Sequence, residues 1–204
     1  MLRQIFQPIR FDWKIATITI VSTLALMVDS YHRFAPRKEV DRTFLYLIVP
    51  IIFIVFVFRE HPREYGFTLG DWRAGLLLTL GGVALMTPVI LLLGRGDPST
   101  QSYYADDLSY LPFSFLELFV WEFLFRGWIL FGYARKFGPE ALWLQAVPFA
   151  LAHIGKPEVE TLSTIFGGFA FGWIAWRTKS FFYPFLIHWY IAILIILVAS
   201  GTLG

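Results

Sequence analysis

The chain has 204 residues, of which 57% are hydrophobic, 19% aromatic and only 16% charged. Ordinary soluble domains carry about a quarter charged residues, so this composition excludes a typical soluble protein. The net charge of +2 is too small to indicate a nucleic-acid partner. The chain has no cysteine, which excludes disulfides, thiol catalysis and thiolate metal sites.

Apolar segments recur along the whole chain, and a helix needs about 20 such residues to cross a bilayer. The first segment, 13–31, is predicted to be a retained span, because no small-residue cleavage site follows it. Further spans are predicted at 43–58, 74–93, 113–133, 141–153, 160–176 and 181–198. Residues 59–72 are expected to form an interfacial loop and residues 95–111 an exposed loop. The sequence therefore predicts a single all-α domain, 1–204, a polytopic transmembrane bundle of about seven spans, with six or eight as alternatives.

Loop charges predict the orientation of this bundle. The N-terminal segment and the loops on its side hold ten Lys and Arg residues, beginning with Arg3, and the opposite loops hold six. Cytoplasmic loops collect Lys and Arg, so ten against six favours a cytoplasmic N-terminus.

The fourth span carries three charged residues, Glu117, Glu122 and Arg126. An ionisable side chain at a helix centre costs roughly 2.5–3.5 kcal/mol, so its presence needs an explanation. Glu122 and Arg126 are four residues apart, which predicts an ion pair on one helix face. This pair either only neutralises itself or belongs to a site. Glu117 lies on the opposite face from Arg126, so it either has a different partner or sits at the membrane surface.

Two histidines accompany these charges, His153 at the end of the fifth span and His188 inside the seventh. A histidine at a helix end is usually only a hydrogen-bonded polar group, whereas one inside an apolar run indicates function. Lys156 and Glu160 place a cation and an anion next to His153. Convergence of such residues within a bilayer predicts a functional site, which could activate water, bind a metal or relay protons.

The order of these motifs resembles the CaaX-processing and bacteriocin-processing intramembrane protease family, called CPBP or Abi. The resemblance covers about residues 113–200. The matching features are, in order, Glu122-Phe-Leu-Phe-Arg126-Gly127, Phe149-x-x-x-His153, a glycine-rich span, Thr178-x-Ser180 and His188.

The resemblance implies a helix bundle around a metal-free hydrolytic site without a cofactor. In this family a glutamate activates water, histidines orient it and stabilise the oxyanion, and an asparagine assists. Glu122 and Arg126 match the second glutamate and the arginine of the Glu-Glu-x-x-x-Arg motif, and His153 and His188 match the family's histidines. The implied substrates are peptides or membrane-protein segments, including lipidated tails, and the implied location is the cytoplasmic membrane.

The sequence departs from the family at two motif positions. Trp121 stands where the first glutamate is expected, and Ala192 stands where the asparagine is expected. Glu117 lies one helical turn before Trp121, within about 40° of its face, and is one candidate for a replacement acid. Glu160, close to His153 along the chain, is the other.

Two functions follow as hypotheses. The first is an intramembrane glutamic-type endopeptidase that uses Glu122 or a replacement acid together with His153 and His188. The second is a catalytically inactive relative that binds peptides or partner membrane proteins, which Trp121 and Ala192 favour. A proton or ion pathway is a third possibility. The two histidines and one carboxylate could complete a zinc shell, but the resemblance implies no metal.

Overall fold

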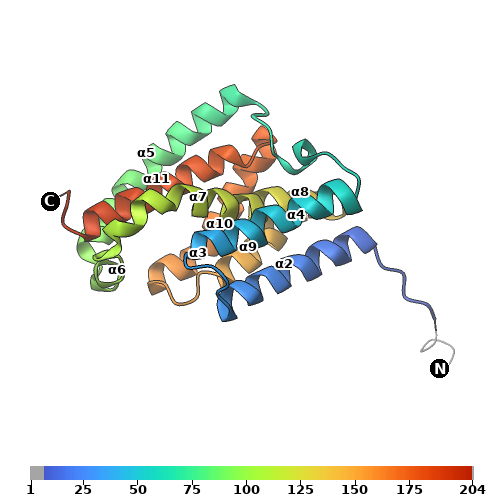
Figure 1. The fold of residues 1–204 in the computed structure, drawn as a ribbon. Helices are drawn as coiled ribbons and strands as arrows, with labels where there is room; N and C mark the ends of the chain where they lie inside the picture. Colours follow the sequence, from blue (N-terminus) through green and yellow to red (C-terminus); the bar gives the residue numbers. More distant parts are fainter. Residues whose placement is uncertain (1–6, 204) are drawn as a thin grey trace.

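The computed structural model describes residues 7–203, which form helices and loops and contain no β-strand. Figure 1 shows long helices lying side by side, with the start of α2 and the end of α11 at opposite ends of the bundle. The all-α prediction is therefore confirmed. Arg3, with which the count of loop charges begins, lies outside the described residues.

Each of the seven predicted segments contains a helix or an unbroken run of helical turns. The first two are α2 (Trp13–Tyr31) and the run α3 (Lys38–Thr43), η1 (Phe44–Ile48), α4 (Val49–Ile52) and η2 (Phe53–Val57). The third and fourth are α5 (Trp72–Gly96) and the run α7 (Leu111–Glu122), η5 (Phe123–Ile129) and α8 (Leu130–Phe137). The last three are α9 (Ala141–Leu151), α10 (Glu158–Thr178) and α11 (Phe182–Ala199). Shorter turns are η3 (Pro62–Tyr65), η4 (Asp107–Tyr110) and η6 (Gly138–Glu140).

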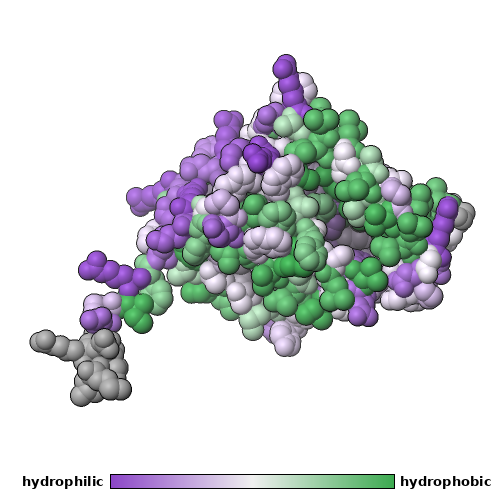
Figure 2. Space-filling view, turned by 180° about the vertical axis from the view of Figure 1, so that it is seen from behind, coloured by the Kyte–Doolittle hydropathy of each residue, from purple (hydrophilic) through white to green (hydrophobic). Residues whose placement is uncertain are grey.

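Five helical segments of the described chain are long and apolar enough to cross a membrane. They are 13–31, 38–57, 72–96, 107–151 and 182–199. Figure 2 shows hydrophobic residues covering the middle of one face, with hydrophilic residues gathered toward its ends. This distribution matches a bilayer around the middle of the bundle. The chain is thus a multi-pass membrane protein.

The segment 95–111 is mostly exposed as predicted, but the prediction of a loop was wrong, because the segment folds into α6 (Pro98–Tyr104) and η4. Asp97 begins α6 by accepting a hydrogen bond from the backbone N–H of Thr100 at 2.9 Å. Pro98 suits the first helical position, where no N–H partner is needed. Tyr104 then packs against Ile90 and Ile195, so tertiary contacts hold this polar segment against the bundle.

The glycines of α10 allow close helix packing. A Cβ atom on Gly168 would lie 3.0 Å from the Cβ of Ala146, and one on Gly172 would lie 2.6 Å from Nε2 of Gln145. Gln145 donates from Nε2 to the carbonyl oxygen of Gly168 at 2.7 Å. This contact joins α9 to α10, the two helices on either side of the turn that carries His153.

Candidate active site

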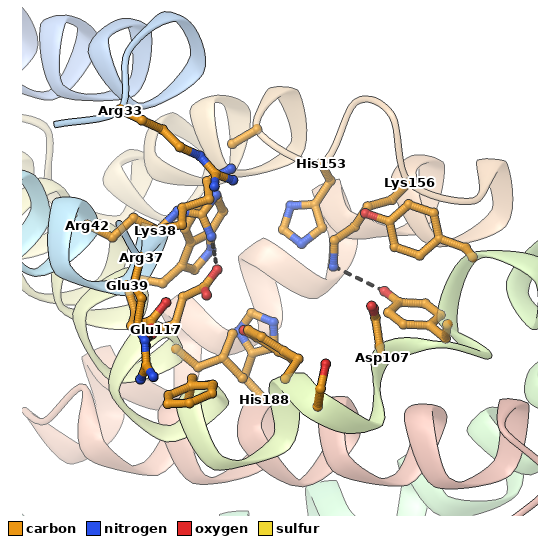
Figure 3. A pocket seen from close by; sticks show the side chains of 18 of the residues that line it. Arg33, Arg37, Lys38, Glu39, Arg42, Asp107, Glu117, His153, Lys156 and His188 are labelled. Atoms are coloured by element: carbon orange, nitrogen blue, oxygen red, sulfur yellow. Dashed lines mark hydrogen bonds and ion pairs between the residues drawn. The ribbon is translucent and has the colours of Figure 1, made fainter. Parts of the chain in front are cut away.

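A cavity of about 820 Å³ opens at the end of the bundle where the chain passes from α2 to α3 and from α9 to α10. Its walls come from α3, α6, η4, α7, α11 and these two connections (Figure 3). The charged, histidine and indole side chains among its lining residues are Arg33, Arg37, Lys38, Glu39, Arg42, Asp107, Glu117, Trp121, His153, Lys156 and His188. Two of the three predicted catalytic residues, His153 and His188, therefore line one cavity.

Glu122 lies behind His188 and is fully buried. Its Oε1 atom accepts from Nδ1 of His188 at 2.7 Å and from Nη1 of Arg126 at 3.2 Å. The predicted pair between Glu122 and Arg126 is thus present, and the carboxylate also holds a histidine 66 residues further along the chain. A carboxylate oxygen accepts here, so this contact places a proton on Nδ1 of His188 and, in a neutral imidazole, leaves Nε2 free to act as a base.

Arg126 is also fully buried and lies in η5, a stretch of π-helix that directly follows Glu122. Its guanidinium lies 3.8 Å from the ring centroid of Phe149. Nε and Nη2 of Arg126 and Oε2 of Glu122 have no hydrogen-bond partner among the described residues. In the described part of the chain, the bond between Oε1 of Glu122 and Nη1 of Arg126 is the one contact through which a carboxylate compensates the buried guanidinium. Removal of Glu122 would therefore leave the Arg126 charge uncompensated.

His153 lies in the turn after α9, with its Nδ1 atom 2.8 Å from the carbonyl oxygen of Phe149. A carbonyl only accepts, so this histidine also carries its proton on Nδ1. Burial lowers the pKa of His153 to about 3, and the nearby charge of Lys156 lowers it further in the same direction. The ring of His153 lies 6.4 Å from the ring of His188 between centroids. Two imidazoles, of which at least that of His153 is neutral, therefore share one cavity.

Trp121 lies in the cavity wall, where the family motif has its first glutamate. Its ring centroid is 5.9 Å from the ring of His153, and the guanidinium of Arg42 lies 4.8 Å from the Trp121 ring. The indole thus occupies space beside the histidine and carries no carboxylate that could polarise water.

Glu117 also lines this cavity, as expected from its position one turn before Trp121. Its carboxylate forms an ion pair with Arg42, whose guanidinium also binds Asp29 at 3.1 Å. Arg42 is therefore the partner that the sequence left open for Glu117. The sequence did not single out Arg42, because it lies before the predicted start of the second span.

Glu160 pairs with Lys156 at 2.8 Å and accepts from the hydroxyl of Tyr104 at 2.6 Å. Lys156 also donates to this hydroxyl at 3.1 Å and lines the cavity. Glu160 is not among the residues that line the cavity. The two candidate replacement acids, Glu117 and Glu160, are therefore each held by a cation.

Within residues 7–203, no group of three or more His, Asp or Glu residues is arranged to hold a metal ion. The two histidines and Glu122 do not surround a common point, because Glu122 binds Nδ1 of His188 from behind. The arrangement is that of a histidine oriented by a carboxylate.

Residues 108–194 match the family model of type II CAAX prenyl endopeptidases, described as Rce1-like. This segment of the chain is similar to that family, and it is called the Rce1-like segment below. This confirms the resemblance to the CPBP family. No curated protein and no solved structure gives a significant match to the chain.

The Rce1-like segment contains Glu122, Arg126, His153 and His188, and it begins just before α7. The cationic part of the cavity wall at Arg33, Arg37, Lys38 and Arg42 lies outside it. The Rce1-like segment therefore carries the histidines, whereas the opposite wall comes from the N-terminal part of the chain.

Proposed function

We propose that the protein is an intramembrane endopeptidase in which His188, oriented by Glu122, activates water. The observation that carries this proposal is the 2.7 Å contact between Oε1 of Glu122 and Nδ1 of His188, together with the place of His188 in the cavity wall. A carboxylate that fixes the tautomer of a histidine is the arrangement by which histidine serves as a general base.

The reaction follows from these positions. A water molecule between His188 and His153 loses a proton to Nε2 of His188 while its oxygen attacks the carbonyl carbon of a peptide. Glu122 stabilises the imidazolium that forms, and Arg126 holds the Glu122 carboxylate in place through their ion pair. His188 then returns the proton to the departing amine as the carbon–nitrogen bond breaks. This mechanism differs from the one implied by the resemblance, because the glutamate acts through a histidine instead of directly on water.

The proposed substrate is a peptide or membrane-protein segment, with or without a lipid, hydrolysed near the membrane surface.

The orientation of the cavity follows from the two ends of the bundle. Glu60 forms ion pairs with both Lys14 and Arg135, so the start of α2 and the end of α8 lie at the same end. The connections from α2 to α3 and from α9 to α10, which line the cavity, lie at the other end (Figure 1). We propose that the protein resides in the cytoplasmic membrane with a cytoplasmic N-terminus, so the cavity opens on the non-cytoplasmic side.

The test compares membranes of cells that produce the wild type, His188→Ala or Glu122→Gln. Mass spectrometry of peptide termini identifies fragments that depend on the protein. We expect fragments with the wild type and their loss with His188→Ala. His32→Ala is the control, because His32 is exposed after the last turn of α2. Fragments that persist with His188→Ala would contradict the proposal.

A second candidate function is that of an inactive, peptide-binding relative. The observations that favour it are the indole of Trp121 in the place of the acid and the cations that hold Glu117 and Glu160. In this case no terminus would depend on the protein. The His188→Ala variant would instead weaken the recovery of bound peptides with the purified protein.

A further inference from the structure

Lysine and arginine residues are unevenly distributed at the cavity end of the bundle. The loops and helix ends at this end carry six of them, Arg33, Arg37, Lys38, Arg42, Arg95 and Lys156. Five of the six line the cavity, and only Arg95 lies elsewhere. A cation that served only to anchor the protein at the membrane surface would have no reason to gather in one cavity. This concentration indicates that the cavity binds an anionic group.

The cations on the wall opposite the histidines differ in how well acids compensate them. Arg42 is fully compensated, since it binds both Asp29 and Glu117. The other three are not. Arg37 and Lys38 reach an acid only at 4.0 Å. Arg33 forms no ion pair with any residue of the described chain.

These three residues, Arg33, Arg37 and Lys38, are called the cationic wall below. Figure 3 shows Arg33, Lys38 and Arg37 along one side of the cavity, with His153 and Lys156 across the space from them. Arg37 is also positioned by stacking over the ring of Phe113 at 4.3 Å. The wall thus has cationic groups available for a ligand that enters the cavity.

The acids that pair with the cavity cations limit the charge of that ligand. Arg42 binds Asp29 and Glu117, and Lys156 binds Glu160, so these two cations are compensated. Against the three cations of the cationic wall, the remaining lining acids are Glu39 and Asp107. This small positive surplus fits a singly charged carboxylate better than a phosphate dianion. Two arginines also match the planar geometry of a carboxylate.

We infer that the cationic wall binds a carboxylate of the peptide substrate while the peptide bond lies at the histidines. The carboxylate comes from the chain terminus or from an acidic side chain. A peptide fits because one cavity contains both the cations and the histidines, and an extended chain can contact both walls. This inference rests on the proposed function only in taking the ligand to be a peptide.

Binding can be separated from cleavage with the full-length His188→Gln variant, purified in dodecyl maltoside. Calorimetric titration would use three probes: N-acetyl-Ala-Phe-Leu-Ala with a free carboxylate, its C-terminal amide, and the amide of N-acetyl-Ala-Phe-Glu-Ala. We expect the free acid, the glutamate peptide or both to bind about tenfold more tightly than the first amide. Which of the two does so identifies the source of the carboxylate.

The substitutions Arg33→Gln and Arg37→Gln together should remove this preference, whereas Arg95→Gln should leave it unchanged. Both wall residues are exposed, so their replacement should not prevent folding. Equal binding of all three peptides, absence of binding by all three, or a preference that survives the double substitution would overturn the inference. Loss of the preference in phosphatidylglycerol but not phosphatidylcholine nanodiscs would assign the wall to lipid headgroups and also overturn it. The proposed function is tested by a different measurement, and absence of cleavage by the wild type would contradict it.

Discussion

Glu122 and His188 are joined by a 2.7 Å contact between Oε1 and Nδ1, although 66 residues separate them in the chain. Trp121, the neighbour of Glu122, faces the cavity instead. The second glutamate of the family motif is therefore buried behind a histidine, and the position of the first is taken by an indole. Proton transfer in the cavity therefore depends on His188 and on its contact with Glu122.

The contact between Glu122 and Arg126 predicts a large effect on stability. Glu122→Leu should lower the free energy of unfolding by about 3–5 kcal/mol, because it leaves the buried cation of Arg126 without a carboxylate. The double variant Glu122→Leu/Arg126→Leu should lose less than Glu122→Leu alone. Unfolding in detergent, followed by circular dichroism, measures both. A double variant less stable than Glu122→Leu would show that the charge of Arg126 is compensated by something other than Glu122.

Trp121 predicts a gain of activity on restoring the acid. Trp121→Glu should raise the rate of cleavage at least about tenfold, because a carboxylate beside His153 adds a base close to the water. Trp121→Gln is the matched control, with nearly the same shape and no charge. Initial rates are measured on a peptide identified from the termini found in membranes. Equal rates for the two variants would show that the carboxylate has no catalytic role at this position.

The lowered pKa of His153 predicts a pH dependence of stability. The pKa is about 3 in the folded protein, against an ordinary value of 6.5, so the unfolded chain binds more protons between these two values. The contribution of neutral His153 to stability is therefore complete above pH 6.5 and is lost as the pH falls toward 3. The melting temperature of the wild type should fall more steeply between pH 6.5 and 4.5 than that of His153→Gln. Parallel curves would contradict this pKa.

The glycines of α10 provide a matched pair for packing. Gly172→Ala places a Cβ atom 2.6 Å from Nε2 of Gln145 and should destabilise the protein by about 1–3 kcal/mol. Gly167→Ala meets no atom within 4 Å and should be neutral, or stabilising by up to about 1 kcal/mol. Melting temperatures in detergent compare the two variants. Equal loss in both would mean that close contact with α9 does not explain the cost at Gly172.

The proposed orientation predicts which side of the membrane each loop faces. The chain has no cysteine, so a single introduced cysteine can be labelled without background. Ser109→Cys lies at the cavity, and Lys136→Cys lies at the end of α8, where the bundle carries Arg135. A membrane-impermeant maleimide should label Ser109→Cys in intact cells and Lys136→Cys only after permeabilisation. The reverse pattern would invert the orientation.

Several features could be predicted from sequence because they depend on local patterns. Long apolar runs identify membrane spans, since each residue is transferred into lipid largely independently. The pair of Glu122 and Arg126 follows from a spacing of four residues along one helix. The motif order around His153 and His188 identified the family that residues 108–194 then matched.

Only the tertiary structure decided which distant side chains meet. Glu117 finds Arg42, 75 residues away, and Glu122 finds His188, because helix packing and not spacing brings them together. The cavity likewise brings the cationic wall together with the histidines of α11 and of the turn after α9. Side-chain direction across a helix interface depends on the rotation and depth of each helix, which no single segment specifies. The spans and the motif residues were therefore set by local sequence, whereas the pairing of each acid was set by the packing of the bundle.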